Sequence, residues 1–381
     1  DLREDELSST VFIAAGKREF NNVALQPVIK EMWKTAFNRI AAANDLISNV
    51  SAASDSKFRK GEMERKMIHG EALAIRALLH FDMLRLFAPA PVNDDGQVYI
   101  PYVTTFPQIL GTHIPVKEAL DNVIKDLEEA RELVKVYDFS LLGMSANASG
   151  NARFYNRLEY GMEGYNKTDD LEEFFLGRGY RFSYWAVTGL LARAYQYKAA
   201  YDASFYEKAK TLAQEILDAK CTDAKGGNSY TPFKNEDFNG FAYAQDPEQM
   251  RNVRMVENLL LGIYRDNDAE QKLSGIEANF PREKKSPAQY NFCAVDVDGQ
   301  DIFKTTGGAD ESQEDIRCKR LLYKPINSYN ILLSTKWYVK TRDAEERKKT
   351  LNIFPILRTS EMRFIIAETL ARNNEFDKAY E

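Results

Sequence analysis

The chain has 381 residues, of which 44% are hydrophobic and 28% charged, and these ordinary globular values exclude a fully disordered or fibrous protein. Its formal net charge is −6 and no stretch collects five or six basic residues, so we expect no nucleic-acid partner. No run of about 18 apolar residues could span a bilayer, and the acidic first residues do not resemble a signal peptide, so we expect any targeting segment to have been removed.

Cysteine and aromatic content bear further on function. Cys221, Cys293 and Cys318 are widely spaced and contain no C-x-x-C pair, so neither a zinc site nor a disulfide framework is predicted, and at most one bridge could form. The 20 Tyr and 22 Phe residues raise the aromatic fraction to 12%, which is unusually high. The fold must therefore accommodate a surplus of aromatic side chains.

Apolar periodicity predicts a helical hairpin in the first part of the chain. From Gln26 to Val50 the apolar side chains recur on one stripe, which indicates an amphipathic helix. A longer pattern runs from Glu62 to Phe87 and ends before Pro89 and Pro91, because each proline lacks an N–H and crowds the preceding turn. We expect these two helices to pair.

Three more helices follow. One begins at Pro115 and keeps its apolar residues on one face and its charges on the other. From Tyr184 to Tyr197 apolar residues surround the helix almost completely, which predicts a central helix packed between neighbours. Ser204-x-x-Glu207 has the pattern of a capping box and opens the antiparallel partner of that helix.

The helix pair from Tyr184 to Ala219 has tetratricopeptide character, with small residues where the two helices must approach closely. A weaker copy closes the sequence: a helix from Glu361 to Leu370, a turn, and a second helix that starts at Phe376 and stops at Glu381. We therefore expect the natural protein to continue beyond this sequence. The predicted fold class is mostly α, with tetratricopeptide-like paired helices in one scaffold.

Three long irregular stretches separate the helices, at about 93–112, 138–179 and 222–319. Structureless loops of more than about 15 residues are usually functional or disordered, and these contain aromatic residues that disordered segments lack. We predict ordered binding loops within a single domain over residues 1–381. Its parts would be a helical scaffold at 27–220, a loop-rich insertion at 222–319 and a C-terminal helical repeat at 328–381.

The loop aromatics are the candidate ligand residues. A sugar ring presents C–H faces that favour an aromatic platform, while amides, carboxylates and guanidinium groups bond its hydroxyls. For each residue, packing within its own loop is an equal alternative. The predicted ligand-binding residues are Asn93, Asp94, Asp95, Tyr99 and Tyr102 in the first loop, Tyr155, Tyr160 and Tyr165 in the second, and Tyr290, Asn291 and Phe292 in the third.

No catalytic or metal site is predicted. Asp296-x-Asp298-Gly299-x-Asp301 has the start of a calcium loop, but the twelfth position holds Gly307 where a bidentate Glu is expected, so a solvated turn is favoured. The three histidines indicate neither a metal triad nor a Ser-His-Asp arrangement, and there is no phosphate-binding loop, so no cofactor is expected. The charges of Glu71, Arg76 and Arg85 within a largely apolar helix predict buried pairs that hold packing register.

Four blocks of the sequence resemble the SusD/RagB family. The most specific is Gly70 to Phe87, GEALAIRALLHFDMLRLF, with Pro89 and Pro91-Val92 after it. The others follow in the family's order: Pro115 to Leu133 with its D-L-E-E-A at Asp126 to Ala130, Arg181 to Tyr197 with its L-L-A-R-A-Y, and Pro355 to Glu368 with its P-x-x-R, S-E-M and A-E. The resemblance extends over the whole chain as a series of helices, while the loops match only in placement.

The resemblance implies a surface lipoprotein of the outer membrane of Bacteroidota that captures glycans, or sometimes peptides, for a SusC-like TonB-dependent transporter. The sequence has no lipid-accepting Cys near Asp1, so the lipid anchor is expected to lie outside it. We predict a glycan-binding protein that is not an enzyme. The alternatives are a peptide-binding member of the family, a tetratricopeptide adaptor, which the interruption at 222–319 disfavours, and a glycoside hydrolase, which would need a loop carboxylate of raised pKa.

Overall fold

The computed structural model describes residues 10–108, 111–166, 174–223, 228–233, 254–265 and 352–381, with short pieces between 294 and 334. The chain forms two compact units. Unit 1 comprises Asp1–Glu31, Glu236–Met255 and Ile263–Phe354, and unit 2 comprises Met32–Asn235, Val256–Gly262 and Pro355–Glu381. The single domain over 1–381 and its internal boundaries stay a prediction.

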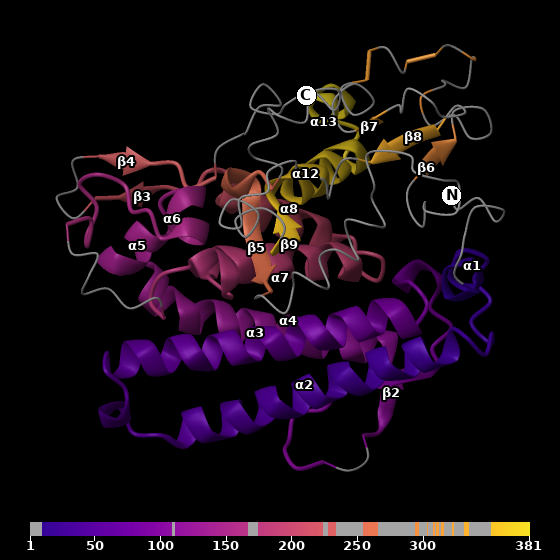
Figure 1. The fold of residues 1–381 in the computed structure, drawn as a ribbon, viewed down its shortest axis with the longest axis horizontal. Coiled ribbons are helices and arrows are strands. Elements are labelled where there is room, and N and C mark those ends of the chain that lie inside the picture. The colour runs from indigo at the N-terminus through magenta and orange to yellow at the C-terminus, as the bar shows by residue number, and fades with distance from the viewer. Residues whose placement is uncertain are drawn as a thin grey trace. The chain divides into compact units, whose positions relative to one another are not determined.

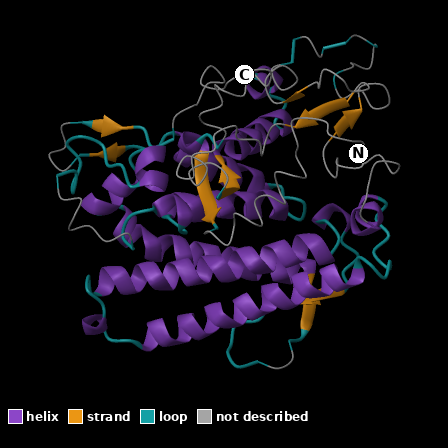
Figure 2. Cartoon of the chain, in the orientation of Figure 1, coloured by secondary structure: helices purple, strands orange, loops and turns teal. Residues whose placement is uncertain are grey.

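Helices dominate the described residues, and strands are few and short (Figure 2). The helices are α1 (Thr10–Gly16), α2 (Gln26–Ala52), α3 (Glu62–Phe87), α4 (Val116–Asp138), α5 (Leu141–Asn147), α6 (Gly150–Tyr155), α7 (Tyr184–Lys198), α8 (Ser204–Leu217), α12 (Thr359–Arg372) and α13 (Phe376–Tyr380). The strands are β1 (Val98–Pro101), β2 (His113–Pro115), β3 (Cys221–Thr222), β4 (Ser229–Tyr230), β5 (Leu259–Tyr264), β6 (Ala294–Asp296), β7 (Leu322–Tyr323), β8 (Ile331–Ser334) and β9 (Ile353–Arg358). The predicted fold class is confirmed.

Unit 2 is built around α3, α4 and α7, which lie alongside one another (Figure 1). Gly70 of α3 lets α3 and α4 approach closely, since a Cβ there would lie 2.9 Å from the carbonyl oxygen of Ala130 in α4. α7 contacts α4, α8 and α12 and is buried on almost every side, which confirms the prediction of a central helix. Apolar side chains from these helices form one continuous core.

Three local predictions were wrong. Arg85 is not a buried charge; it is exposed near the end of α3 and pairs with Asp82 on the same helix at 3.1 Å. Ser204 does not cap α8; the cap residue is Ala203, and the carboxylate of Asp202 accepts the N–H of Ser204 at 2.9 Å. The 138–179 stretch is not irregular throughout, because it contains α5 and α6. Their N-caps Ser140 and Ser149 each accept a backbone N–H at 3.1 Å, which satisfies a donor that the first turn leaves without a helical partner.

Short antiparallel pairs of strands complete unit 2. β1 pairs with β2 across the loop that follows α3, and β3 pairs with β4 with Cys221 opposite Tyr230. In unit 1, β6, β8 and β7 form a three-stranded antiparallel sheet with β8 in the middle. Within the described residues, no helix combines the length and the apolar character that crossing a membrane requires.

Candidate functional site

The loop after α3 carries the first set of predicted ligand residues, and its polar side chains bond to one another. Asn93 is exposed. The carboxylate of Asp94 accepts a hydrogen bond of 2.5 Å from the Tyr201 hydroxyl, and that of Asp95 accepts one of 2.7 Å from the Tyr99 hydroxyl. The bond from Tyr99 lowers the pKa of Asp95. These contacts fix the shape of the loop.

Tyr102 is turned toward the helices. Its ring stacks on His80 with centroids 4.0 Å apart, and its hydroxyl donates to Asp126 at 2.6 Å. Burial and the carboxylate of Asp126 raise the pKa of Tyr102 well above its ordinary value. The hydroxyl of this residue is therefore engaged inside unit 2.

A buried network ties the same loop to α3 and α4. The guanidinium of Arg76 donates two bonds of 2.6 Å to Asp126, which confirms the predicted pairing of this buried charge. His80 Nε2 accepts the N–H of Val103 at 2.9 Å, so Nδ1 carries the proton and donates to the carbonyl of Arg76. Burial lowers the pKa of His80 to about 4, so the ring is neutral and can hold the loop.

The second set contains two exposed tyrosines whose rings are in contact. Tyr160 is 79% exposed and Tyr165 is 39% exposed, and their rings meet edge to face with centroids 5.3 Å apart. Glycines with φ of +86° and +80°, Gly161 and Gly164, turn the backbone between them in a way that other residues rarely adopt. Tyr155, at the end of α6, is only partly exposed. We call Tyr160 and Tyr165 the tyrosine platform.

Polar groups from the β3–β4 hairpin lie beside the tyrosine platform. The position that a Cβ of Gly161 would take is 3.8 Å from the Tyr230 hydroxyl, 3.9 Å from Asp223 Oδ2 and 4.0 Å from Asn228 Nδ2. The Tyr230 hydroxyl donates to the carbonyl of Tyr160 at 2.6 Å, and Asp223 accepts from the side chain of Asn228 at 2.8 Å. We call Asp223, Asn228 and Tyr230 the polar edge; it supplies a hydroxyl, a carboxylate and an amide next to an exposed ring.

The polar edge was not among the predicted residues. The signal that could have found it is Gly226-Gly227, a turn dipeptide between two short β-forming runs, which predicts a hairpin. The local pattern does not predict which loop the hairpin contacts. That loop lies about 60 positions before Asp223 in sequence, beyond the reach of a local pattern.

Buried arginines hold both ends of the segment that carries the platform. On its N-terminal side, Arg153 has no exposed surface, stacks 4.4 Å from the centroid of Phe233, and donates to the carbonyls of Asn147 and Pro232 at 3.0 and 2.6 Å. Met162, which lies between the two tyrosines in sequence, is buried and packs with Cys221 in a small apolar cluster. The platform therefore rests on ordered structure.

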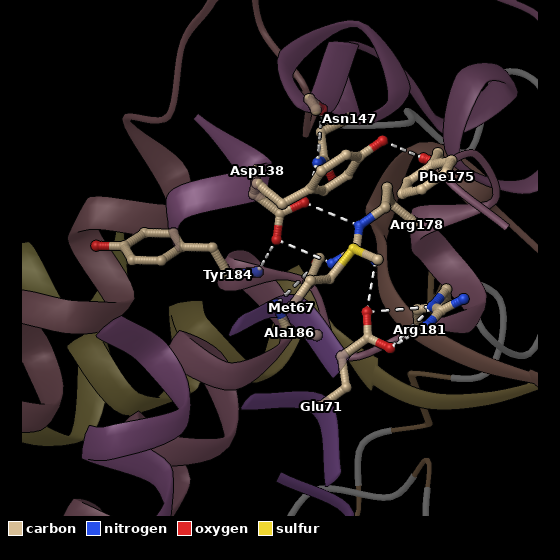
Figure 3. Close-up of polar contacts among 12 residues, drawn as sticks. Met67, Glu71, Asp138, Asn147, Phe175, Arg178, Arg181, Tyr184 and Ala186 are labelled. Carbon is tan, nitrogen blue, oxygen red and sulfur yellow. Dashed lines mark hydrogen bonds and ion pairs between the residues drawn. The ribbon is translucent and has the colours of Figure 1, made fainter. Parts of the chain in front are cut away.

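On its C-terminal side, Arg178 is the centre of a second network (Figure 3). Its guanidinium donates to both oxygens of Asp138 at 2.9 and 3.0 Å and to Glu71 at 2.6 Å. Glu71 also pairs with Arg181, so the predicted burial of Glu71 in ion pairs is confirmed. Asp138 Oδ2 further accepts the first N–H of α7, from Tyr184, at 2.7 Å, which joins this anchor to the core.

Comparison with known proteins agrees with this architecture. A SusD-like family model, described as starch-binding and associating with the outer membrane, matches residues 9–155. The chain superposes on a SusD superfamily protein from Bacteroides thetaiotaomicron VPI-5482 with a TM-score of 0.56 at 19% identity, covering 91% of this chain and 63% of that one. A SusD-like carbohydrate binding protein from Bacteroides vulgatus ATCC 8482 gives 0.53 at 21% identity, with 91% and 59% coverage.

The chain has the SusD fold. The resemblance to the SusD/RagB family that the helical blocks indicate is thereby confirmed. The chain spans about three fifths of the length of these solved SusD proteins. No curated protein matches it.

The remaining candidates of this SusD-like chain lie outside the described residues. These are the third set, Tyr290, Asn291 and Phe292, and most of the acidic loop that begins at Asp296. Among the residues that are described, no group of three or more His, Cys, Asp or Glu side chains could hold a metal ion.

Proposed function

We propose that this chain is a cell-surface glycan-binding protein that delivers its ligand to a partner TonB-dependent transporter of the SusC type, and that it has no catalytic activity. The observation that carries the proposal is the tyrosine platform next to the polar edge. Of the predicted sets in the described residues, this one combines an exposed ring with polar groups beside it.

The chemistry of the site suits a sugar. The axial C–H face of a pyranose packs on an aromatic ring, and its hydroxyls exchange hydrogen bonds with carboxylate, amide and hydroxyl groups. Because the rings of Tyr160 and Tyr165 are nearly perpendicular, with an interplanar angle of 82°, one sugar ring cannot stack on both, so we expect one or two sugar units to be bound. A few such contacts on an open surface support an affinity of about −4 to −8 kcal/mol, millimolar to micromolar.

The description of the matching family model supports the location. It names starch binding and association with the outer membrane. A lipid anchor outside this sequence would hold the chain at the cell surface, and a weak surface site would then act at the high local concentration near a transporter. The first-loop residues Asn93, Asp94, Asp95 and Tyr99 remain proposed as an additional wall for the ligand.

Affinity electrophoresis through gels that contain individual polysaccharides tests the proposal. We expect retardation in at least one gel, and we expect Tyr160→Ala to abolish it. Tyr380→Ala is the matched control, because Tyr380 is 96% exposed and lies in α13, outside the platform and the polar edge. A panel of glucans, mannans, xylans and host glycans that leaves the protein unretarded would contradict glycan binding. Release of oligosaccharide products would contradict the absence of catalysis.

A further inference from the structure

The tyrosine platform lies in an acidic part of the chain. Residues 157–173 contain six acidic residues, Glu159, Glu163, Asp169, Asp170, Glu172 and Glu173, against two basic residues, Arg157 and Lys167. The net charge of this stretch is −4 within a chain whose total is −6, so most of the excess negative charge is concentrated in the segment that carries the rings.

The described part of the site has the same sign. Glu159 immediately precedes Tyr160, Glu163 lies in the turn between the two rings, and both are partly exposed. Asp223, only 5% exposed, adds a carboxylate oxygen beside Gly161. Two exposed cations also lie near these residues: Arg157 precedes Tyr160 by three positions, and Lys220 flanks the β3–β4 hairpin, where it donates to Thr231 at 2.7 Å. The three carboxylates therefore outnumber the two cations.

This arrangement has a consequence for selectivity. Carboxylates within about 10 Å of a bound sugar repel a negative charge on that sugar at low ionic strength. Salt screens this repulsion strongly only at separations longer than the Debye length, which is itself long at low ionic strength. The same carboxylates accept hydrogen bonds from neutral hydroxyls. Repulsion of one ligand class is as effective for specificity as attraction of another.

We propose that the tyrosine platform selects uncharged glycans and rejects those that carry uronate, sulfate or sialate groups. This inference rests on the proposed function and adds the class of ligand to it. Glu159, Glu163 and Asp223 supply the rejection, while Tyr160 and the polar edge supply the binding that both classes would share.

Matched polymers test the inference. The protein is run through gels that contain starch, dextran or methyl-esterified homogalacturonan, each beside the carboxymethylated or de-esterified form of the same backbone, and the best neutral ligand is then titrated calorimetrically. We expect the neutral form to bind about tenfold more tightly at an ionic strength of about 0.02 M, and this preference to shrink toward unity at about 0.5 M.

Charge-neutral variants separate selectivity from binding. In the double variant Glu159→Gln, Glu163→Gln we expect the preference for the neutral form to fall by about threefold or more, while the affinity for that form stays within about a factor of two. The control Glu118→Gln, Glu129→Gln removes the same charge from the exposed face of α4 and should keep the preference.

The outcomes distinguish the two proposals. If the acidic form binds as tightly as the neutral one and Tyr160→Ala removes both, the platform is a glycan site and the selectivity inference is overturned. If no polymer of either class is retarded, glycan binding itself fails and the inference fails with it.

Discussion

Arg178 and Asp138 form a two-point ion pair in which neither side chain has exposed surface, with Nε 2.9 Å from Oδ1 and Nη2 3.0 Å from Oδ2. A second carboxylate, Glu71, takes the remaining face of the guanidinium at 2.6 Å. These acidic partners raise the pKa of Arg178 despite its burial, so the positive charge is retained in the core. The segment after the platform is thus attached to α3 through Glu71 and to α4 through Asp138. Because these charges are buried, water does not solvate them, and each depends on its partner.

Arg178→Met should lower the free energy of unfolding by about 3–5 kcal/mol, because it leaves the carboxylates of Asp138 and Glu71 buried without their central partner. Urea unfolding followed by circular dichroism measures this. Arg372→Met is the control, since it breaks an exposed i,i+4 pair with Glu368 and should cost less than about 1 kcal/mol. Equal losses in the two variants would contradict the assigned role of the buried network.

Stability should fall on mild acidification because of His80. Its pKa is about 4 in the folded protein, lowered mainly by burial, and near its ordinary 6.5 in the unfolded chain. The unfolded chain therefore binds the proton first as the pH drops, and stability present above pH 6.5 is lost between about 6.5 and 4. We expect this residue to contribute a loss of about 2.5 kcal/mol near pH 4.5.

His80→Gln isolates that contribution, because carboxylates titrate in part of the same range. Urea unfolding of both proteins at pH 7 and pH 4.5 should give a smaller difference between the two pH values for the variant, even if the variant is less stable at pH 7. If both proteins lose the same free energy of unfolding between pH 7 and pH 4.5, the neutral His80 ring does not hold the N–H of Val103.

The long helices were predictable because their signals are local. α3 begins at Glu62 and ends at Phe87 as predicted, since 26 residues of apolar pattern stop where Pro89 and Pro91 prevent continuation. α5 and α6 have only 7 and 6 residues, too few for a periodic pattern to show. They owe their formation to Ser caps and to packing against neighbours, which a sequence window does not contain.

The site was predictable only in part, and for a similar reason. The surplus of tyrosines indicated loops that display rings, and Tyr160 and Tyr165 are exposed. Tyr102 has the same local context of a polar loop, but its hydroxyl is engaged by Asp126 in α4, a contact set by the packing of α3 on α4. Tyr230 joins the site through a hairpin that meets the platform 70 residues away in sequence. Which ring faces solvent is decided by such non-local contacts.

Gly70→Ala tests the close approach of α3 and α4. Alanine favours a helix over glycine by about 1 kcal/mol, but the added methyl would lie 2.7 Å from Val134 Cγ1 and 2.9 Å from the carbonyl of Ala130. Overpacking against a backbone atom costs about 1–3 kcal/mol, so we expect a net loss of stability in urea unfolding. Ser48→Ala, on the exposed face of α2, should be neutral or slightly stabilising. A more stable Gly70→Ala would show that α4 moves aside easily.

Tyr230→Phe tests whether the polar edge takes part in ligand binding. The variant keeps the ring that packs near Met162 but loses the hydroxyl that donates to the Tyr160 carbonyl at 2.6 Å. In the parent, the hydroxyl oxygen can still accept a bond from a sugar hydroxyl, and loss of that bond is worth about 0.5–1.5 kcal/mol, so glycan affinity should fall by about 2- to 12-fold in calorimetry. The bond between Tyr230 and the Tyr160 carbonyl is exposed, so its loss should hardly change the thermal midpoint. Tyr380→Phe removes a hydroxyl from a tyrosine that is 96% exposed and lies outside the platform and the polar edge, and this variant should bind as the parent does. If Tyr230→Phe also binds as the parent does, the polar edge only supports the fold, and Tyr160 and Tyr165 alone would make the site.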